Sequence, residues 1–327
     1  MGPCPALSVA VSPRRKQLRL RSASSYAPAA ITNFFSVTYP PRDSGPTIPA
    51  GATGGGYVLS KGVLSRATLV AGGKGNFVTT VVNRDSSYEA RTTRRALSLL
   101  FERFGHSFGR LQLEQYVDVP IGAGFGASAA SAISAVYAAA SALEVGASES
   151  ELARCAHDSE IIEQTGLGTV SVTYTATGAG AITKPGIPGV ARFLNVKVPC
   201  SMRLVTASIA PCDNREMFSH PETTRKIITL GDEALRRFLR DPTLEELAAA
   251  GEWFSDHLGL SNNKVKKLIK VAKSAGASHA SQNMIGQAIH ALVDEDGVGR
   301  VADALRSTYA KPRVDVFEVG LVKATLL

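Results

Sequence analysis

Alternation of apolar and polar residues is clearest just before the middle of the chain. Between residues 111 and 119 the apolar positions are Leu111, Leu113, Val117 and Val119, and only Gln115 breaks the period of two. This spacing predicts a half-buried strand that ends at Pro120. Nine of the seventeen residues at 127–143 are alanine, the residue that most favours helix. The pattern therefore predicts a strand, a short loop and a helix in succession.

The other elements alternate less regularly along the sequence. Strands are predicted at 26–39, 170–174, 181–183, 193–198, 202–209 and 314–319, with a strand pair in 63–82 around the glycines at 72–75. Helices are predicted at 88–104, 148–163, 216–230, 233–239, 243–258, 261–275, 284–292 and 299–308. Ser148 and Glu151 have the spacing of a capping box. Mixed strands come first and helices later, so we expect an α+β fold with mixed sheets, a helix-rich C-terminal half and two lobes separated by a cleft.

The loop between the first strand and helix carries the candidate chemistry. Gly122, Gly124 and Gly126 place no side chain between their backbone N–H groups and a ligand, and glycine tolerates positive φ. Ser128 stands where the helix should begin, and a helix N-terminus offers unpaired N–H groups and the positive end of the helix dipole. The segment therefore predicts a phosphate cradle with a hydroxyl at its edge.

Two other interpretations of this loop compete with the phosphate cradle. It can be a plain turn, or the GxGxxA fingerprint of a dinucleotide fold at residues 122–127, with Glu144 near the distance of a ribose-binding acid. Against the second, the preceding strand is polar on one face, whereas a Rossmann strand is buried on both. Gly126 and Ser128 also have no role in that fingerprint.

Length and charge narrow the class of protein. The chain has 327 residues, 44% of them hydrophobic, which is enough for one large or two modest domains. The net charge is +8, but residues 1–25 hold five basic residues and no acid, which leaves +3 for the remainder. We therefore expect a flexible basic leader at 1–25, with a targeting peptide as the alternative, and no nucleic-acid partner. No apolar run approaches a membrane span, so no membrane partner is expected either.

Cysteine and histidine patterns give no metal motif. The four cysteines form no CxxC pair and the six histidines no HxxxH or HExxH pattern, so a zinc site is not predicted. The cysteines are interpreted as buried thiols of a reducing compartment, which favours a cytoplasmic location.

Residues 120–130, Pro-Ile-Gly-Ala-Gly-Phe-Gly-Ala-Ser-Ala-Ala, resemble the central motif PxGxGxGSSAA of the GHMP small-molecule kinases. Within that superfamily the chain is most similar to the archaeal pantoate kinases. The supporting segments lie at 27–28, 31–35, 51–63, 165–168, 184–189 and 281–286. The resemblance spans about residues 24–320 and implies a two-lobed GHMP-kinase-like fold. Its N-terminal, nucleotide-binding lobe would comprise residues 26–200, and its C-terminal lobe residues 201–327.

The resemblance also implies an activity and a set of site residues. Such kinases transfer the γ-phosphate of ATP, with Mg²⁺, to the 4-hydroxyl of pantoate on the way to coenzyme A. The nucleotide phosphates would be bound by Pro120, Gly122, Ala123, Gly124, Phe125, Gly126, Ala127, Ser128 and Ala129. Ser128 and Glu160 would hold Mg²⁺, and these two with Thr169 form the catalytic set. The glycine cluster would bind substrate through Thr53, Gly54, Gly55 and Gly56, unless it is only a hairpin turn.

The sequence departs from the family pattern at three places. An early Ala-Pro-Gly-His is Ala-Pro-Ala-Ala at 27–30, one serine of the central motif is alanine, and Thr169 stands where the family often has aspartate. The last departure keeps three alternatives open: a GHMP-type kinase of another small hydroxy acid or alcohol, a nicotinamide-dependent oxidoreductase, and a catalytically silent nucleotide-binding relative. His279 and Met284 are assigned to packing, and a homodimer is possible.

Overall fold

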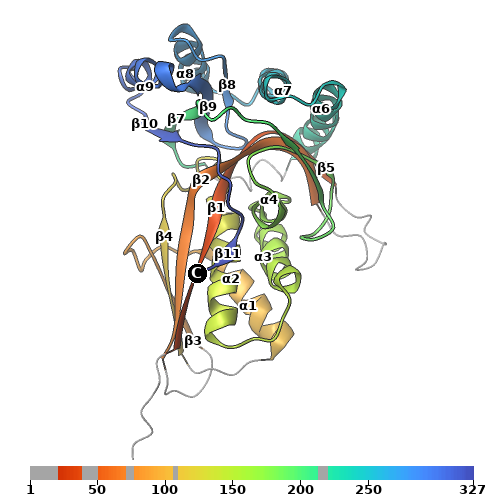
Figure 1. The fold of residues 1–327 in the computed structure, drawn as a ribbon, viewed down its shortest axis with the longest axis vertical. Helices are drawn as coiled ribbons and strands as arrows, with labels where there is room; N and C mark the ends of the chain where they lie inside the picture. Colours follow the sequence, from red (N-terminus) through yellow and green to blue (C-terminus); the bar gives the residue numbers. More distant parts are fainter. Residues whose placement is uncertain (1–20, 39–50, 71–76, 106–109, 213–219) are drawn as a thin grey trace, which may run out of the picture.

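Two β-sheets organise the molecule (Figure 1). The computed structural model describes residues 21–38, 51–70, 77–105, 110–212 and 220–327. The large sheet has the strand order β11-β1-β2-β4-β3, with β5 paired to β2 and β6 paired to β5, and the small sheet has the order β10-β7-β9-β8. The predicted α+β fold with mixed sheets is confirmed.

The large sheet is mostly antiparallel. Its strands are β1 (Arg21–Thr38), β2 (Gly51–Val70), β3 (Phe77–Val82), β4 (Arg110–Val117), β5 (Ala179–Lys184), β6 (Arg192–Val196) and β11 (Thr325–Leu326). Strand β2 is antiparallel to β1, β4 and β5, while β3 is parallel to β4. The predicted strand pair within 63–82 is therefore wrong, because β4 lies between β2 and β3; the glycines at 72–75 lie outside the described residues.

Three helices cover one face of the large sheet, namely α1 (Arg91–Phe104), α2 (Ala127–Ala142) and α3 (Glu149–Glu163) (Figure 1). Nearly all of α2 is buried, since it packs against the sheet and against both other helices. Its alanines allow this close approach on every side. The predicted capping box at Ser148 is confirmed, and it starts α3.

The small sheet has a core of its own. Its strands are β7 (Met202–Ala210), β8 (His279–Gln282), β9 (Gln287–Asp294) and β10 (Arg313–Phe317), which pack with α8 (Asn263–Ser274) and α9 (Val298–Arg306), the latter preceded by the short η2 (Glu295–Gly297). Helices α6 (Pro221–Arg240) and α7 (Leu244–Leu258) instead pack on β1 and join the core of the large sheet. The lobe boundary at residue 200 stays a prediction; α6 and α7 follow it in sequence but pack in the same core as the strands that precede it.

Two predicted elements have the wrong type. Residues 170–174 belong to helix α4 (Thr169–Thr175), although they are rich in β-branched residues, because a buried hydrogen bond to Val170 fixes the first turn. The predicted helix at 284–292 is instead strand β9, in which both faces are buried. A short, mostly apolar segment of this kind does not distinguish a buried strand from a buried helix.

Two predicted boundaries are also wrong. The helices expected at 216–230 and 233–239 are joined in the single helix α6, which begins at Pro221, while the predicted residues 216–219 lie outside the described residues. Gly231 does not break this helix; a Cβ there would lie 2.0 Å from the carbonyl oxygen of Phe35, so the glycine allows α6 to touch β1. Residues 1–20 of the predicted leader lie outside the described residues, but residues 21–25 already belong to β1, and Ser25 is buried.

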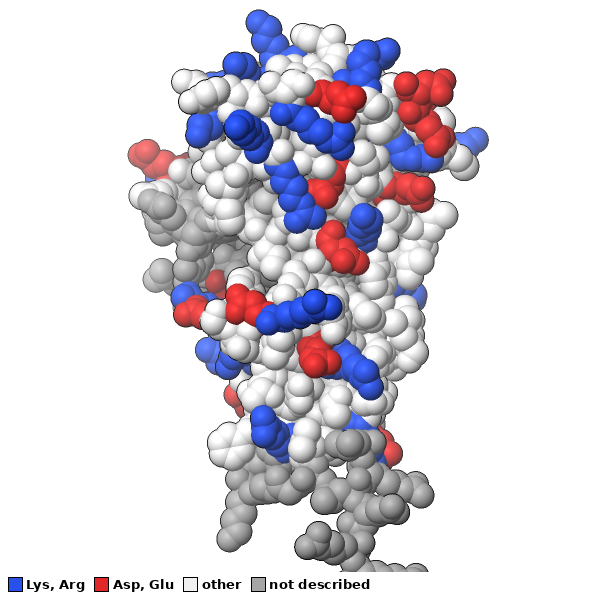
Figure 2. All heavy atoms as spheres, turned by 90° about the vertical axis from the view of Figure 1, so that its left-hand side faces the viewer, with Lys and Arg blue, Asp and Glu red and all other residues white. Residues whose placement is uncertain are grey.

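Charged side chains of both signs are interspersed on the face shown in Figure 2. Basic residues predominate toward its upper end (Figure 2). Helix α8 carries five lysines, which are Lys264, Lys266, Lys267, Lys270 and Lys273. No helix within the described part of the chain has the length and apolar character needed to span a membrane.

Candidate active site

The glycine loop joins β4 to α2 in a left-handed backbone conformation. Gly122, Gly124 and Gly126 have φ values of +73°, +81° and +63°, which only glycine adopts at little cost. Neighbouring backbone groups hold the loop at both ends: the N–H of Ala30 donates to the carbonyl of Phe125 (3.1 Å), and that of Cys212 to the carbonyl of Gly122 (2.7 Å). The loop ends at Gly126, which is the N-cap of α2.

A cavity of about 720 Å³ opens in front of this loop. Its wall includes most of the predicted phosphate-binding residues, namely Gly122, Gly124, Phe125, Gly126, Ala127 and Ser128. Pro120, Ala123 and Ala129 are buried beneath the loop. The opposite walls come from residues 85–93, before and at the start of α1, and from residues 163–165 at the end of α3. The space thus has a helix N-terminus and a glycine loop on one side.

A second, smaller cavity of about 110 Å³ lies beside the first, between β1, β2 and α4. The four predicted substrate-binding residues, Thr53, Gly54, Gly55 and Gly56, line it. Most of its other wall residues are apolar, among them Ile31, Phe35, Val58, Val172 and Ile182. Four residues line both cavities, and these are Thr32, Thr165, Thr169 and Met284. A group bound in the large cavity can therefore face a group bound in the small one across these four side chains.

The glycine cluster of β2 is not a hairpin turn, because residues 51–70 form one continuous strand. A Cβ at Gly54 would lie 2.3 Å from the carbonyl oxygen of Phe34, and one at Gly56 would lie 2.0 Å from that of Ile31. These glycines are therefore required by the close approach of β1, in addition to bordering the small cavity.

Glu160 lies behind the cavity wall. Its side chain is almost completely buried, and burial raises the pKa of its carboxyl to about 7, although the hydrogen bond from the N–H of Val170 (3.1 Å) opposes this shift. A Cβ at Gly166 would lie 2.5 Å from its Oε1. The carboxylate thus contacts the turn at 165–169 from the inside, while Ser128 and Thr169 lie on the cavity wall. The structure places Ser128 and Thr169 on the wall of the same cavity, whereas Glu160 is buried behind that wall.

A magnesium ion would find only part of a site in this arrangement. Within the ranges that the structure describes, no three His, Cys, Asp or Glu side chains are grouped so that they could hold a metal. Mg²⁺ usually binds through one or two carboxylates and the oxygens of a substrate phosphate, so a complete protein cage is not needed. Ser128, on the cavity wall, can add a hydroxyl oxygen to such a site. The carboxylate of Glu160 is a suitable ligand chemically, but it is buried and one of its oxygens accepts from the N–H of Val170.

Three of the four residues at the junction were not predicted as site residues. Thr32, Thr165 and Met284 lie in segments that the family resemblance singled out, at 31–35, 165–168 and 281–286, and Met284 was assigned to packing. Their local sequence carries no signal of a site. Only the fold shows that three segments far apart in sequence meet beside the glycine loop.

The dinucleotide interpretation does not fit this fold. The strand before the loop, β4, is parallel to β3 but antiparallel to β2, whereas a Rossmann unit is built on a mostly parallel sheet. Glu144 follows the opposite end of the 16-residue helix α2, roughly 24 Å from the loop, and forms an exposed ion pair with Arg21. It therefore has no access to a ligand at the glycines.

Comparisons with known proteins agree with this geometry. Residues 91–177 match the GHMP kinases N terminal domain. A pantoate kinase of Thermococcus kodakarensis is 26% identical over 274 residues, which cover 83% of this chain and 88% of that relative. A solved structure described as a phosphotransferase related to the CoA biosynthesis pathway superposes with a TM-score of 0.82 at 23% identity, covering 93% of this chain and 98% of that chain.

A homoserine kinase structure from Cytophaga hutchinsonii superposes with a TM-score of 0.64 at 15% identity, over 98% of this chain and 100% of that chain. Both structural likenesses concern the fold. Residues 91–177 thus match the GHMP kinases N terminal domain, and the similarity of the chain to pantoate kinases over most of its length is confirmed.

Proposed function

We propose that this protein transfers the γ-phosphate of ATP to the 4-hydroxyl of pantoate, a step toward coenzyme A. The observation that carries the proposal is the pair of cavities that meet at Thr32, Thr165, Thr169 and Met284. One has the architecture of a phosphate site and the other is a small, largely apolar space. The pantoate kinase from Thermococcus kodakarensis supports the choice of substrate.

In this proposal the triphosphate lies in the large cavity along the glycine loop. The free N–H groups at the start of α2 and the helix dipole favour its negative charge. The hydroxyl of Ser128, in the first turn of α2, contacts the phosphates and Mg²⁺. Mg²⁺ would be held by Ser128 and Glu160 and would neutralise charge that develops on the transferred group. Because metal binding favours the ionised carboxylate, it would lower the pKa of Glu160 from its value near 7.

The dimethyl and hydroxymethyl part of pantoate occupies the small cavity. Its two methyl groups contact the apolar wall formed by residues such as Val172 and Ile182, and its 4-hydroxyl faces the junction. On the described wall of this cavity no carboxylate is available to act as a base, and Thr169 stands where, by the resemblance, the family often has an aspartate. Phosphoryl transfer proceeds through a loose transition state, so positioning and charge neutralisation can supply most of the barrier reduction. The rate of phosphoryl transfer therefore depends on alignment of the 4-hydroxyl with the γ-phosphate rather than on abstraction of the hydroxyl proton.

The lining of the small cavity also supports a second candidate function, a kinase of another small alcohol. A cavity wall with Thr169 and without a described charged side chain also suits a small alcohol other than pantoate. We further propose that the protein works in the cytoplasm, which the thiols of Cys155 and Cys200, neither of them in a disulfide, support. A homodimer and the absence of nucleic-acid or membrane partners stay predictions.

An activity assay separates the candidates. Purified protein is incubated with ATP, Mg²⁺ and one hydroxy compound at a time, and ADP release is followed. Release that depends on pantoate supports the proposal. Release only with mevalonate, homoserine or shikimate keeps the enzyme class and changes the substrate. Tight ATP binding without turnover on any compound identifies a silent relative.

A further inference from the structure

The turn between β8 and β9 lies directly against the glycine loop. A Cβ at Gly286 would lie 2.4 Å from the carbonyl carbon of Ala123 and 2.8 Å from the backbone nitrogen of Gly124. A Cβ at Gly124 would in turn lie 2.9 Å from the Cβ of Asn283. The two backbones are therefore in contact, with no room for an added side chain between them.

Buried hydrogen bonds fix the shape of this turn. The N–H of Asn283 donates to the carbonyl of Ala288 (2.9 Å), and Nε2 of Gln282 donates to the carbonyl of Gly286 (2.8 Å). The turn is also attached to β1, because the N–H of Met284 donates to the carbonyl of Thr32 (3.0 Å). Its backbone is thus held both from within and from the strand that borders the two cavities.

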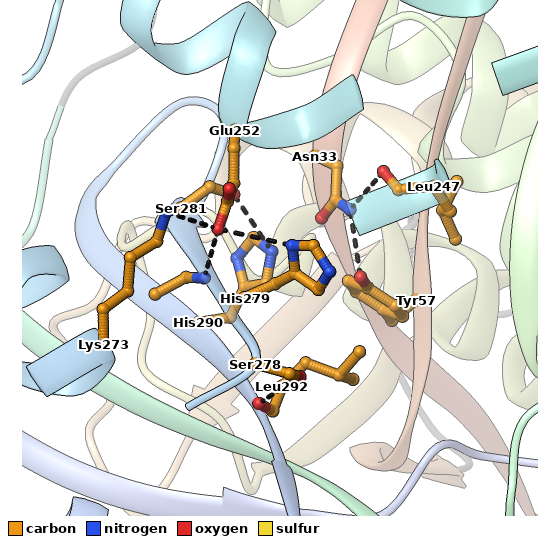
Figure 3. Close-up of polar contacts among 11 residues, drawn as sticks. Asn33, Tyr57, Leu247, Glu252, Lys273, Ser278, His279, Ser281, His290 and Leu292 are labelled. Carbon is orange, nitrogen blue, oxygen red and sulfur yellow. Dashed lines mark hydrogen bonds and ion pairs between the residues drawn. The ribbon is translucent and has the colours of Figure 1, made fainter. Parts of the chain in front are cut away.

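The side chain of His290 completes this network. Its Nδ1 lies 2.8 Å from Oδ1 of Asn283 and its Nε2 lies 3.3 Å from the hydroxyl of Ser281. Burial lowers the pKa of His290 to about 3, so the ring is neutral at physiological pH. Since the amide oxygen can only accept, Nδ1 carries the proton and Nε2 accepts from Ser281. Figure 3 shows His290 beside Ser281, and its ring stands edge-on to that of Tyr57 (centroids 5.4 Å apart).

Stability alone is a poor reason for this arrangement. Nδ2 of Asn283 is buried and has no hydrogen-bond partner within the described part of the chain. An unsatisfied buried donor is costly, and an apolar side chain would avoid the cost. The side-chain amide of Asn283 is explained if its role is to bind His290 and so keep the 283–286 turn in one position.

We propose that Asn283 and His290 are positioning residues for the nucleotide: they hold the 283–286 turn against Ala123 and Gly124 and so preorganise the glycine loop. Three glycines with positive φ make a loop that loses much conformational freedom when it binds a ligand. A loop that is already fixed by a neighbouring turn avoids part of that loss and binds more tightly. The inference rests on the proposed function insofar as the loop binds the phosphates of ATP.

The first test measures the dissociation constant of a non-hydrolysable ATP analogue with Mg²⁺ by calorimetry, together with the melting temperature. His290→Phe keeps a ring beside Tyr57 but removes both the donor to Asn283 and the acceptor for Ser281, and we expect at least about tenfold weaker binding from the loss of these two buried hydrogen bonds. His290→Asn keeps a donor near Nδ1 and should restore affinity to within about threefold. Ser278→Ala is the matched control, because it removes a hydrogen bond to the carbonyl of Leu292 at the other end of the same hairpin (Figure 3) and should leave affinity unchanged.

A second pair of variants covers the case in which the histidine variants do not fold. Gly286→Ala forces the turn and the loop apart and should weaken analogue binding at least tenfold, whereas Gly299→Ala in α9, where a Cβ meets nothing within 4 Å, should not. Equal affinity in wild type, His290→Phe and Gly286→Ala would overturn the inference. Absence of analogue binding in the wild type would instead contradict the proposed function, so the two failures are distinguishable.

Discussion

Burial of Glu160 makes the stability of the protein depend on pH in a direction opposite to that of most carboxylates. The pKa of its carboxyl rises from 4.5 to about 7 on folding, with burial as the main cause. The folded state therefore binds this proton more tightly than the unfolded state. The resulting stabilisation is fully present below pH 4.5 and is lost as the pH rises through about 7. At about 1.4 kcal/mol per pKa unit, the loss amounts to about 3 kcal/mol.

Glu160→Gln removes this titration while keeping an oxygen that can accept from the N–H of Val170. We expect the free energy of unfolding of the wild type to fall by about 3 kcal/mol, relative to that of the variant, between pH 4.5 and pH 8. Urea unfolding at a series of pH values measures this difference. Glu149→Gln, at the exposed start of the same helix, is the control and should follow the wild-type pH dependence. Parallel curves for wild type and Glu160→Gln would refute the reasoning.

Further predictions concern the loop, the junction and the small cavity. Ser128→Ala should lower kcat by about 10²–10³ without a matching loss of melting temperature, because it removes one preorganised polar contact; near-normal turnover would place the phosphate site elsewhere. Thr169→Ala should have a much smaller effect on kcat, and Thr169→Asp should be tolerated or faster; a large loss in Thr169→Ala would contradict catalysis by alignment. Gly126→Ala should destabilise the fold by about 1–2 kcal/mol from its positive φ alone. It also places a Cβ 2.7 Å from Cγ2 of Thr169, so Thr169→Ser in the same chain should recover part of the total loss in urea unfolding. A pantoate analogue without the two methyl groups should lose about tenfold in kcat/KM, at about 0.8 kcal/mol per buried carbon; equal kcat/KM would argue against an apolar acceptor cavity.

The glycine loop and its helix could be predicted because their signal is local. The alternation in β4, the spacing of three glycines and the alanines of α2 all lie within about thirty consecutive residues of the chain. The capping box at Ser148 is equally local. These features depend on residues that are close in sequence, and the structure has the strand, the loop, the helix and the capping box at the predicted positions.

The elements that could not be predicted depend on distant contacts. Helix α4 has the composition of a strand, but Glu160 accepts a hydrogen bond in its first turn and Ala52 of β2 packs against its N-cap, Gly168. Strand β9 has the composition of a buried helix, and only its pairing with β7 and β8 identifies it. The same limit applies to the junction of the two cavities, because Thr32 and Met284 are brought together by a single β-bridge between remote segments.

A polar cluster away from the cavities connects the two cores. Glu252 of α7 contacts Lys273 of α8 (2.8 Å) and His279 of β8 (3.5 Å), and it accepts from the N–H of Ala280 (2.8 Å) (Figure 3). Burial alone would raise the pKa of the Glu252 carboxyl, but these partners overcome it and lower the pKa to about 2. The ionised carboxylate thus links α7, which packs on the large sheet, to α8 and β8 beside the small sheet.

The central claim is that phosphate moves from the large cavity to a hydroxyl in the small one, and the product of the reaction tests this most directly. Wild-type protein is incubated with ATP, Mg²⁺ and pantoate, and the phosphorus NMR signal of the product is recorded with proton coupling. The account predicts a new phosphate ester split into a triplet by the two protons of the CH₂ group that bears the 4-hydroxyl. A doublet, from the single proton beside the 2-hydroxyl, or inorganic phosphate with no ester at all, would contradict it.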